Sequence, residues 1–136
     1  MKGYLLQEQS FIIGSAVIVD SDASENNYSV IFEDDGDTAY FYAAERTAAE
    51  DGLRILDAVH IYNADEIAEE EKQARVCIIW SKDWLKCALV INNYCHAVFD
   101  FEQHGGYSRN EFPPPNDFWT QGDRALTDER IAAIFG

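Results

Sequence analysis

The first half of the sequence has very few positively charged residues. Residues 1–71 contain three Lys or Arg against 17 Asp or Glu, whereas residues 72–136 contain seven against eight. The whole chain has a net charge of −15 and a pI of about 4.3. A protein that binds nucleic acid needs a basic face for the phosphates. The composition therefore argues against a nucleic-acid partner, and a field of this sign is suited to attract a basic one.

Cysteine is scarce, and its spacing fits no known site. The three residues Cys77, Cys87 and Cys95 form no CxxC pair, and their odd number does not suggest a disulfide framework or a zinc knuckle. All three lie in apolar segments that look like strands. We expect buried, reduced thiols, which suits the cytoplasm.

Long hydrophobic runs and glycine-rich loops are missing as well. The N-terminal residues 1–6 become polar too soon for a signal peptide, and no apolar run approaches the roughly 20 residues of a membrane helix. Gly14, Gly36 and Gly52 are isolated, so no phosphate loop or dinucleotide fingerprint is present. We expect a cytoplasmic protein that binds no membrane and no nucleotide or other cofactor.

The residues that are present are sufficient for a folded core. Hydrophobic residues make up 47% of the 136 residues and aromatic residues 13%, and 136 residues is close to the commonest domain size. We therefore expect one domain over residues 1–136.

The pattern of apolar residues predicts mostly strands. Asp35-Gly36 between two β-rich runs is typical of a tight hairpin, and Asn92-Asn93 suits a turn with positive φ. Thr127 is a good N-cap for a short C-terminal helix. The expected strands are 11–19, 28–33, 38–43, 55–62, 75–80, 84–91 and 94–101, and the expected helices are 44–53 and 127–135. An extension of the first helix through 55–62 is the alternative for that segment, and residues 64–74 are either an exposed helix or a solvated connection.

These elements predict an α+β fold. It has a single antiparallel sheet of about six strands, made of a hairpin and a three-strand meander, with one or two short helices including the C-terminal one.

The acidic turn that follows Glu33 is the sharpest local feature. Asp34, Asp35 and Asp37 surround Gly36. Asp and Gly are common in hairpin turns, so a plain turn is one interpretation. An acidic knob that faces a partner is a second. A calcium site is a third, although the full twelve-residue calcium loop is absent and we expect no metal.

The segment 106–115 brings an arginine, two aromatic residues and three prolines into one loop. Such a loop forms a recognition surface or covers a sheet edge against aggregation. Tyr107 and Arg109 are its candidate contact residues.

No catalytic constellation is evident. The motif GxSxG is absent, and the neighbours Cys95 and His96 point to opposite faces of a strand. A small hydrolase would have to use Asp100 with His96 or His104, brought together by the fold. We expect no catalytic residue, and the hydrolase remains an alternative.

Two stretches of sequence resemble a known family. They are FEDDGDTAYFYA with ILDAVHIYN (32–43 and 55–63), and ALVINNYCHAVFDF with the FPPP run (88–101 and 112–115). Together, over about residues 28–115, they resemble a small uncharacterised bacterial domain family. The resemblance implies a bacterial, cytoplasmic, single-domain protein and brings no activity with it.

The expected function is therefore an acidic, non-enzymatic interaction protein. One form is an immunity-type protein that masks the basic active site of a toxin. Another is a structural or regulatory module, either a monomer or a homodimer formed by pairing of sheet edges. The expected partner contacts are Glu33, Asp34, Asp35, Asp37, Tyr107 and Arg109.

Overall fold

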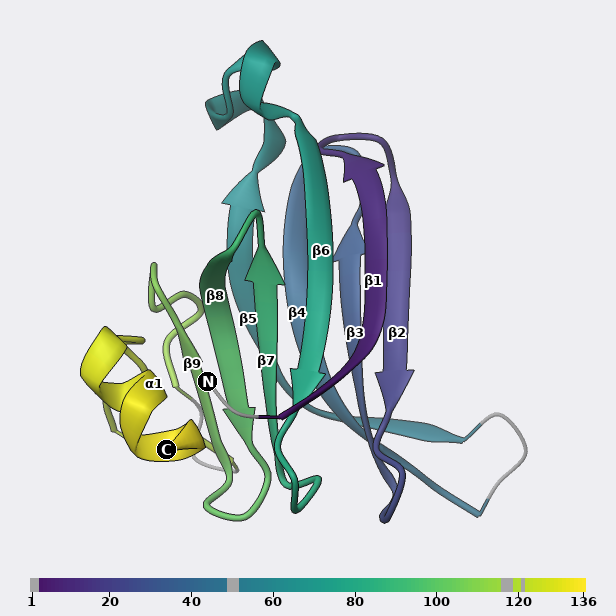
Figure 1. Ribbon diagram of the computed structural model, residues 1–136, viewed down its shortest axis with the longest axis vertical. Helices are drawn as coiled ribbons and strands as arrows, with labels where there is room; N and C mark the ends of the chain where they lie inside the picture. The colour runs from purple at the N-terminus through teal and green to yellow at the C-terminus, as the bar shows by residue number, and fades with distance from the viewer. Residues whose placement is uncertain (1–2, 49–51, 116–118, 121) are drawn as a thin grey trace.

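The fold is known from a computed structural model, which describes residues 3–48, 52–115, 119–120 and 122–136. Within these residues the chain forms nine strands, two 3-10 turns and one α-helix (Figure 1). In chain order they are β1 (Tyr4–Ile12), β2 (Val17–Asp22), β3 (Tyr28–Asp34), β4 (Thr38–Arg46), β5 (Leu53–Asn63), η1 (Ala64–Glu66), η2 (Glu69–Glu71), β6 (Gln73–Trp80), β7 (Lys86–Ile91), β8 (Tyr94–Asp100), β9 (Gly105–Ser108) and α1 (Asp128–Phe135).

The strands form two antiparallel sheets, and not the single sheet expected. One has the order β1-β6-β7-β8-β9 and the other β2-β3-β4-β5. Each has one apolar face, and the two faces pack together because neither can stay exposed to water. Phe41 of β4 stacks on Phe99 of β8 with ring centroids 5.0 Å apart. An apolar pattern reveals that a segment is a strand but not which sheet the strand joins, so the prediction of one sheet was wrong.

The first predicted strand, 11–19, is divided in the structure. β1 ends at Ile12 and β2 begins at Val17, and the chain turns between them through Gly14 (φ 89°) and Ala16 (φ 63°). Most of β1 precedes the predicted segment. It is exposed along residues 4–10, so it lacks the apolar alternation that reveals a strand.

The predicted helix over 44–53 was wrong in its described part, and residues 49–51 lie outside the described residues. β4 continues to Arg46, and β5 starts at Leu53. Glu45 pairs with Arg54 across the two strands. Pairing within the sheet has overridden the helix propensity of an Ala- and Glu-rich segment. Residues 64–74 form the turns η1 and η2 and then enter β6.

Other local predictions are confirmed. The hairpin β3–β4 and the meander β6–β7–β8 are present, and Asn92 and Asn93 have φ of 51° and 66°. The hydroxyl of Thr127 accepts a hydrogen bond from the backbone N–H of Arg130 and so caps α1. Phe135 of α1 belongs to a buried hydrophobic cluster with Val98 of β8, separate from the main core.

The two sides of the sandwich differ. On one side, the segment after β9 reaches β5, where the N–H of His60 donates to the carbonyl of Phe112 (2.7 Å). Tyr107 lies in an edge strand, β9, which the sequence pattern did not reveal.

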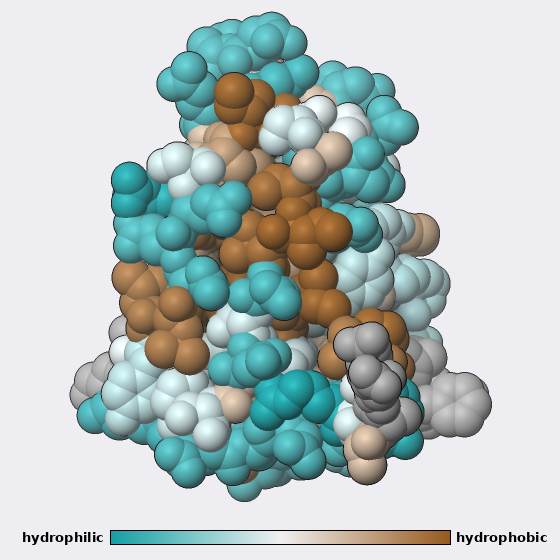
Figure 2. Space-filling model, turned by 90° about the vertical axis from the view of Figure 1, so that its right-hand side faces the viewer, coloured by the Kyte–Doolittle hydropathy of each residue, from teal (hydrophilic) through white to brown (hydrophobic). Residues whose placement is uncertain are grey.

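On the other side, β1 and β2 are sheet edges. Figure 2 faces this side and shows a hydrophobic band running along it. Leu5, Leu6 and Ile18 are among the exposed side chains of these strands. A homodimer formed by pairing of sheet edges stays a prediction.

Two further expectations concern thiols and membranes. Cys87 and Cys95 are buried and Cys77 is half-buried, and all three are free thiols. None of the helices in the described ranges is long and apolar enough to cross a membrane.

Candidate functional site

Two acidic segments that are distant in the sequence meet at one end of the sandwich. The β3–β4 turn and the η1–η2 segment lie at the end drawn uppermost in Figure 1. The backbone N–H of Ala64 donates to the carbonyl of Asp37 (2.7 Å), and a hollow of about 540 Å³ between the two segments is lined in part by Asp37, Asp65 and Glu66. We call this surface the acidic end; its exposed carboxylates are those of Asp35, Asp37, Asp65, Glu66, Glu69, Glu70 and Glu71.

Asp34 belongs to the interior of this end. Its side chain is buried, and its carboxylate accepts hydrogen bonds from the N–H of Gly14 (2.6 Å), the N–H of Gly36 (2.8 Å) and the hydroxyl of Tyr62 (2.6 Å). Burial, followed by the hydrogen bond and the charge of Asp34, raises the pKa of Tyr62 well above its usual value. Asp34 therefore joins the β1–β2 turn, the β3–β4 turn and β5. Its carboxylate is not part of the exposed acidic surface.

Asp35 is exposed and shapes the turn. Its carboxylate accepts the backbone N–H groups of Thr38 and Asp37, both at 2.9 Å. These hydrogen bonds, that of Thr38 first, lower the pKa of Asp35, so its negative charge is retained under mildly acidic conditions. Among the described residues, no three His, Cys, Asp or Glu side chains converge as metal ligands. The calcium interpretation has no ligand set in that part of the chain.

Few positively charged side chains neutralise the carboxylates of the acidic end. Lys72 is its one ion-paired cation in the described ranges, with Nζ 3.0 Å from a carboxylate oxygen of Glu69. The other ion pairs are Arg46–Asp22, Arg54–Glu45, Arg75–Glu8, Lys86–Asp83, Lys86–Glu102, Arg109–Asp128, Arg124–Asp57 and Arg130–Asp123, and none of them includes a carboxylate of the acidic end. Apart from Glu69, the exposed carboxylates of this end have no ion pair among the described residues, so the surface is strongly negative.

Glu33 lies beside the acidic end, on the outer face of the four-stranded sheet. It is half-buried between Ile18 of β2 and Tyr40 of β4, its neighbours across the strands. Burial and then the charge of Glu33 raise the pKa of Tyr42. Glu33 therefore contributes to the field on this face, but it is less exposed than the turn residues that follow it.

Tyr107 and Arg109 hold the C-terminal segment in place. The guanidinium of Arg109 donates to the carbonyls of Cys95 (2.9 Å) and Leu126 (3.2 Å) and pairs with Asp128 (3.0 Å). The guanidinium of Arg130 lies 4.4 Å from the ring centroid of Tyr107. The structure thus gives both predicted contact residues a role in internal contacts. A role in binding a partner stays a prediction for them.

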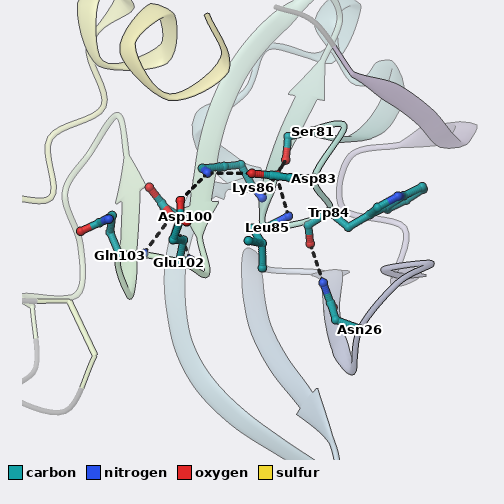
Figure 3. Close-up of polar contacts among 9 residues, drawn as sticks. All are labelled: Asn26, Ser81, Asp83, Trp84, Leu85, Lys86, Asp100, Glu102 and Gln103. Carbon is teal, nitrogen blue, oxygen red and sulfur yellow. Dashed lines mark hydrogen bonds and ion pairs between the residues drawn. The ribbon is translucent and has the colours of Figure 1, made fainter.

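The residues of the alternative hydrolase do not form one group. His104 stacks on Trp119 in a hollow at the other end of β5, whereas His96 lines a hollow beside η2. The carboxylate of Asp100 accepts the N–H groups of Glu102 and Gln103, both at 3.0 Å, and so caps the turn after β8 (Figure 3). No hydrogen bond joins Asp100, His96 and His104 within the described residues.

Lys86 is the centre of the polar network that Figure 3 shows. Its Nζ lies 3.1 Å from a carboxylate oxygen of Asp83 and 2.8 Å from one of Glu102. Partial burial opposes ionisation of Asp83, but hydrogen bonds from Ser81, Leu85 and Lys86 lower its pKa overall. Lys86 bridges the two carboxylates, so the network ties the turn after β6 to the turn after β8.

The free energy of unfolding at acidic pH tests whether the surroundings of His96 disfavour its protonated form. Burial, and then the charge of Arg109, lower the pKa of His96 to about 4. At pH values between the ordinary pKa of histidine and about 4, His96 binds a proton in the unfolded chain but not in the folded chain. His96 therefore destabilises the fold as the pH falls through this range. We expect the free energy of unfolding of H96Q, relative to the native chain, to rise by up to roughly 3 kcal/mol between neutral pH and pH 4. Urea unfolding across that range measures it, and parallel pH curves for the two proteins would contradict it.

The sequence did not reveal that Arg124 and Asp57 form a buried ion pair. Arg124 and Asp57 have side chains 1% and 3% exposed, and Arg124 Nη2 lies 3.1 Å from both carboxylate oxygens. The hydroxyl of Thr120 donates to the same carboxylate (2.5 Å) and accepts the N–H of Gly106 (2.8 Å). A methyl group at Gly106 would overlap this carboxylate. The charged side chain in the apolar strand 55–62 was the available signal for Asp57.

Comparison with known proteins gives a family but no activity. Residues 11–135 match the family DUF2251, described as an uncharacterized protein conserved in bacteria. A protein of Haemophilus influenzae, itself called an uncharacterized protein, is 37% identical over 97 residues. The matched region is 70% of this chain and 59% of that relative, so the chain spans about three fifths of the relative's length. No solved structure matches the chain.

Proposed function

We propose that this chain, which belongs to the DUF2251 family of bacterial proteins, is a non-enzymatic interaction protein. Its acidic end binds a basic partner. The observation that carries the proposal is the meeting of the β3–β4 turn with η1–η2, which concentrates carboxylates of which, among the described residues, Glu69 alone has an ion pair. Complementary fields of this kind speed the encounter of two proteins and orient them.

The exposed carboxylates are free to pair with a partner. Asp37, Asp65, Glu70 and Glu71 are exposed, and none of their carboxylates accepts a hydrogen bond or forms an ion pair within the described residues. Hydrogen bonds of the buried Asp34 carboxylate fix the β3–β4 turn, which carries Asp37. A fixed arrangement of charges loses little conformational entropy on binding. An immunity-type inhibitor that covers a basic active site is one form of this function.

Titration with a basic probe peptide tests the proposal. A short peptide of alternating lysine and arginine should bind, whereas a peptide of the same length built from serine and glutamine should not. Because exposed charges are screened by salt, we expect the dissociation constant to rise at least about tenfold between low and moderately high ionic strength. Calorimetry measures both constants. Failure of the basic peptide to bind, or binding that is insensitive to salt, would contradict the proposal.

A further inference from the structure

A second hollow lies next to the acidic end, between η2 and the β7–β8 turn. Its volume is about 460 Å³. The walls include Ile67, Ile91, Tyr94 and His96, and Glu70 and Glu71 stand at its rim. We call it the η2 hollow. The hollow between Asp37 and Asp65 differs, because its lining is mostly polar and includes Lys72.

The walls of the η2 hollow are held in place by contacts within the chain. The ring of Tyr94 lies against the edge of His96 (centroids 4.9 Å apart), and the guanidinium of Arg109 lies 4.5 Å from the centroid of Tyr94. Ile91 is buried, and Ile67 is half-buried against the main core. A preformed wall does not have to be ordered when a ligand enters.

The two carboxylates at the rim of the η2 hollow favour a cation, and the guanidinium of Arg109 on the Tyr94 ring is itself paired with Asp128 (3.0 Å). Glu70 and Glu71 are exposed and have no ion pair within the described residues. His96 has a pKa of about 4, so it is neutral near pH 7 and does not repel a positive group. An anionic ligand would meet two carboxylates, and a purely apolar one would leave them without a partner.

From the walls and the rim together we propose that the η2 hollow receives an arginine side chain of the basic partner, an inference that rests on the proposed function. The aliphatic part of arginine packs on Ile67 and the ring of Tyr94, and the guanidinium pairs with the carboxylates of Glu70 and Glu71. Arginine fits better than lysine because its planar guanidinium pairs with carboxylates through two hydrogen bonds and stacks on aromatic rings.

Two probe peptides of equal length and charge test this assignment, one with arginine and one with lysine at every basic position. We expect the native chain to bind the arginine peptide about five- to tenfold more tightly. Y94A changes no charge, and it should reduce this preference to less than about twofold while leaving the lysine peptide nearly unaffected. I67A serves as a second uncharged variant in case Y94A is unstable. D37N/D65N, on the other side of the acidic end, is the control: it should weaken both peptides equally.

The outcomes separate the two proposals. Equal affinity of the native chain for both peptides would overturn the arginine assignment and leave the acidic binding surface intact. A preference for arginine that persists in both Y94A and I67A would also overturn it. If neither peptide binds the native chain, the proposed function itself fails.

Discussion

Removing either member of the buried pair Arg124–Asp57 is expected to destabilise the fold by about 3–5 kcal/mol. Both side chains are almost fully buried. D57A would leave the guanidinium of Arg124 without its carboxylate and the hydroxyl of Thr120 without its acceptor. R124A would leave the Asp57 carboxylate with the Thr120 hydroxyl and a backbone N–H as its donors. An uncompensated charge in a low-dielectric interior is costly, and this cost dominates the expected loss.

A matched control distinguishes burial from charge. The pair Arg54–Glu45 joins neighbouring strands at the surface, with Arg54 67% exposed. R54A should cost less than about 1 kcal/mol, because water and salt screen an exposed pair. The double variant D57L/R124M, which removes both buried charges, should be less destabilised than either single variant. Urea unfolding gives all these values, and a loss below about 1 kcal/mol for R124A would contradict a structural role for the pair.

The hairpin and the meander could be predicted because their signals are local. Gly36, Asn92 and Asn93 have positive φ, which few other residues adopt readily, and segments rich in β-branched and aromatic residues flank both turns. Thr127 likewise marks the start of α1 from a single side chain. These features depend on residues a few positions apart, so one sequence was enough.

The division into two sheets and the buried ion pair depend on distant residues. Ser21 accepts the indole N–H of Trp80 (3.0 Å), and Asp57 binds Arg124, yet nothing near these residues in the sequence identifies the partner. The acidic end is an intermediate case. The sequence showed two acidic segments, but only the fold places the β3–β4 turn beside η1. The same fold buries Asp34, which composition alone could not distinguish from Asp35.

Neutralising the acidic end is expected to slow association with a basic partner strongly. The variant D37N/D65N/E70Q/E71Q removes four exposed carboxylates that have no hydrogen-bond or ion-pair partner within the described residues, so the fold should be unaffected. Electrostatic steering depends on where the charge lies as well as on its total. We expect the association rate constant with the lysine–arginine peptide to fall about tenfold or more at low salt.

A second variant removes the same amount of charge elsewhere. D20N/E25Q/E111Q/E129Q also neutralises four exposed acidic residues, which belong to β2, the β2–β3 loop, the loop after β9 and α1, and form no ion pair among the described residues. Both variants raise the net charge equally from −15. Any difference between them therefore reports the position of the charge and not its sum.

The ratio of the association rate constants of these two variants, measured by stopped flow at low salt, is the most direct test. If the carboxylates at the β3–β4 turn and η1–η2 attract the partner, the control variant associates at least about fivefold faster than the acidic-end variant, and the difference shrinks as salt is added. Equal rate constants at every salt concentration would mean that the chain attracts cations through its total charge alone, which would contradict a docking surface at this end.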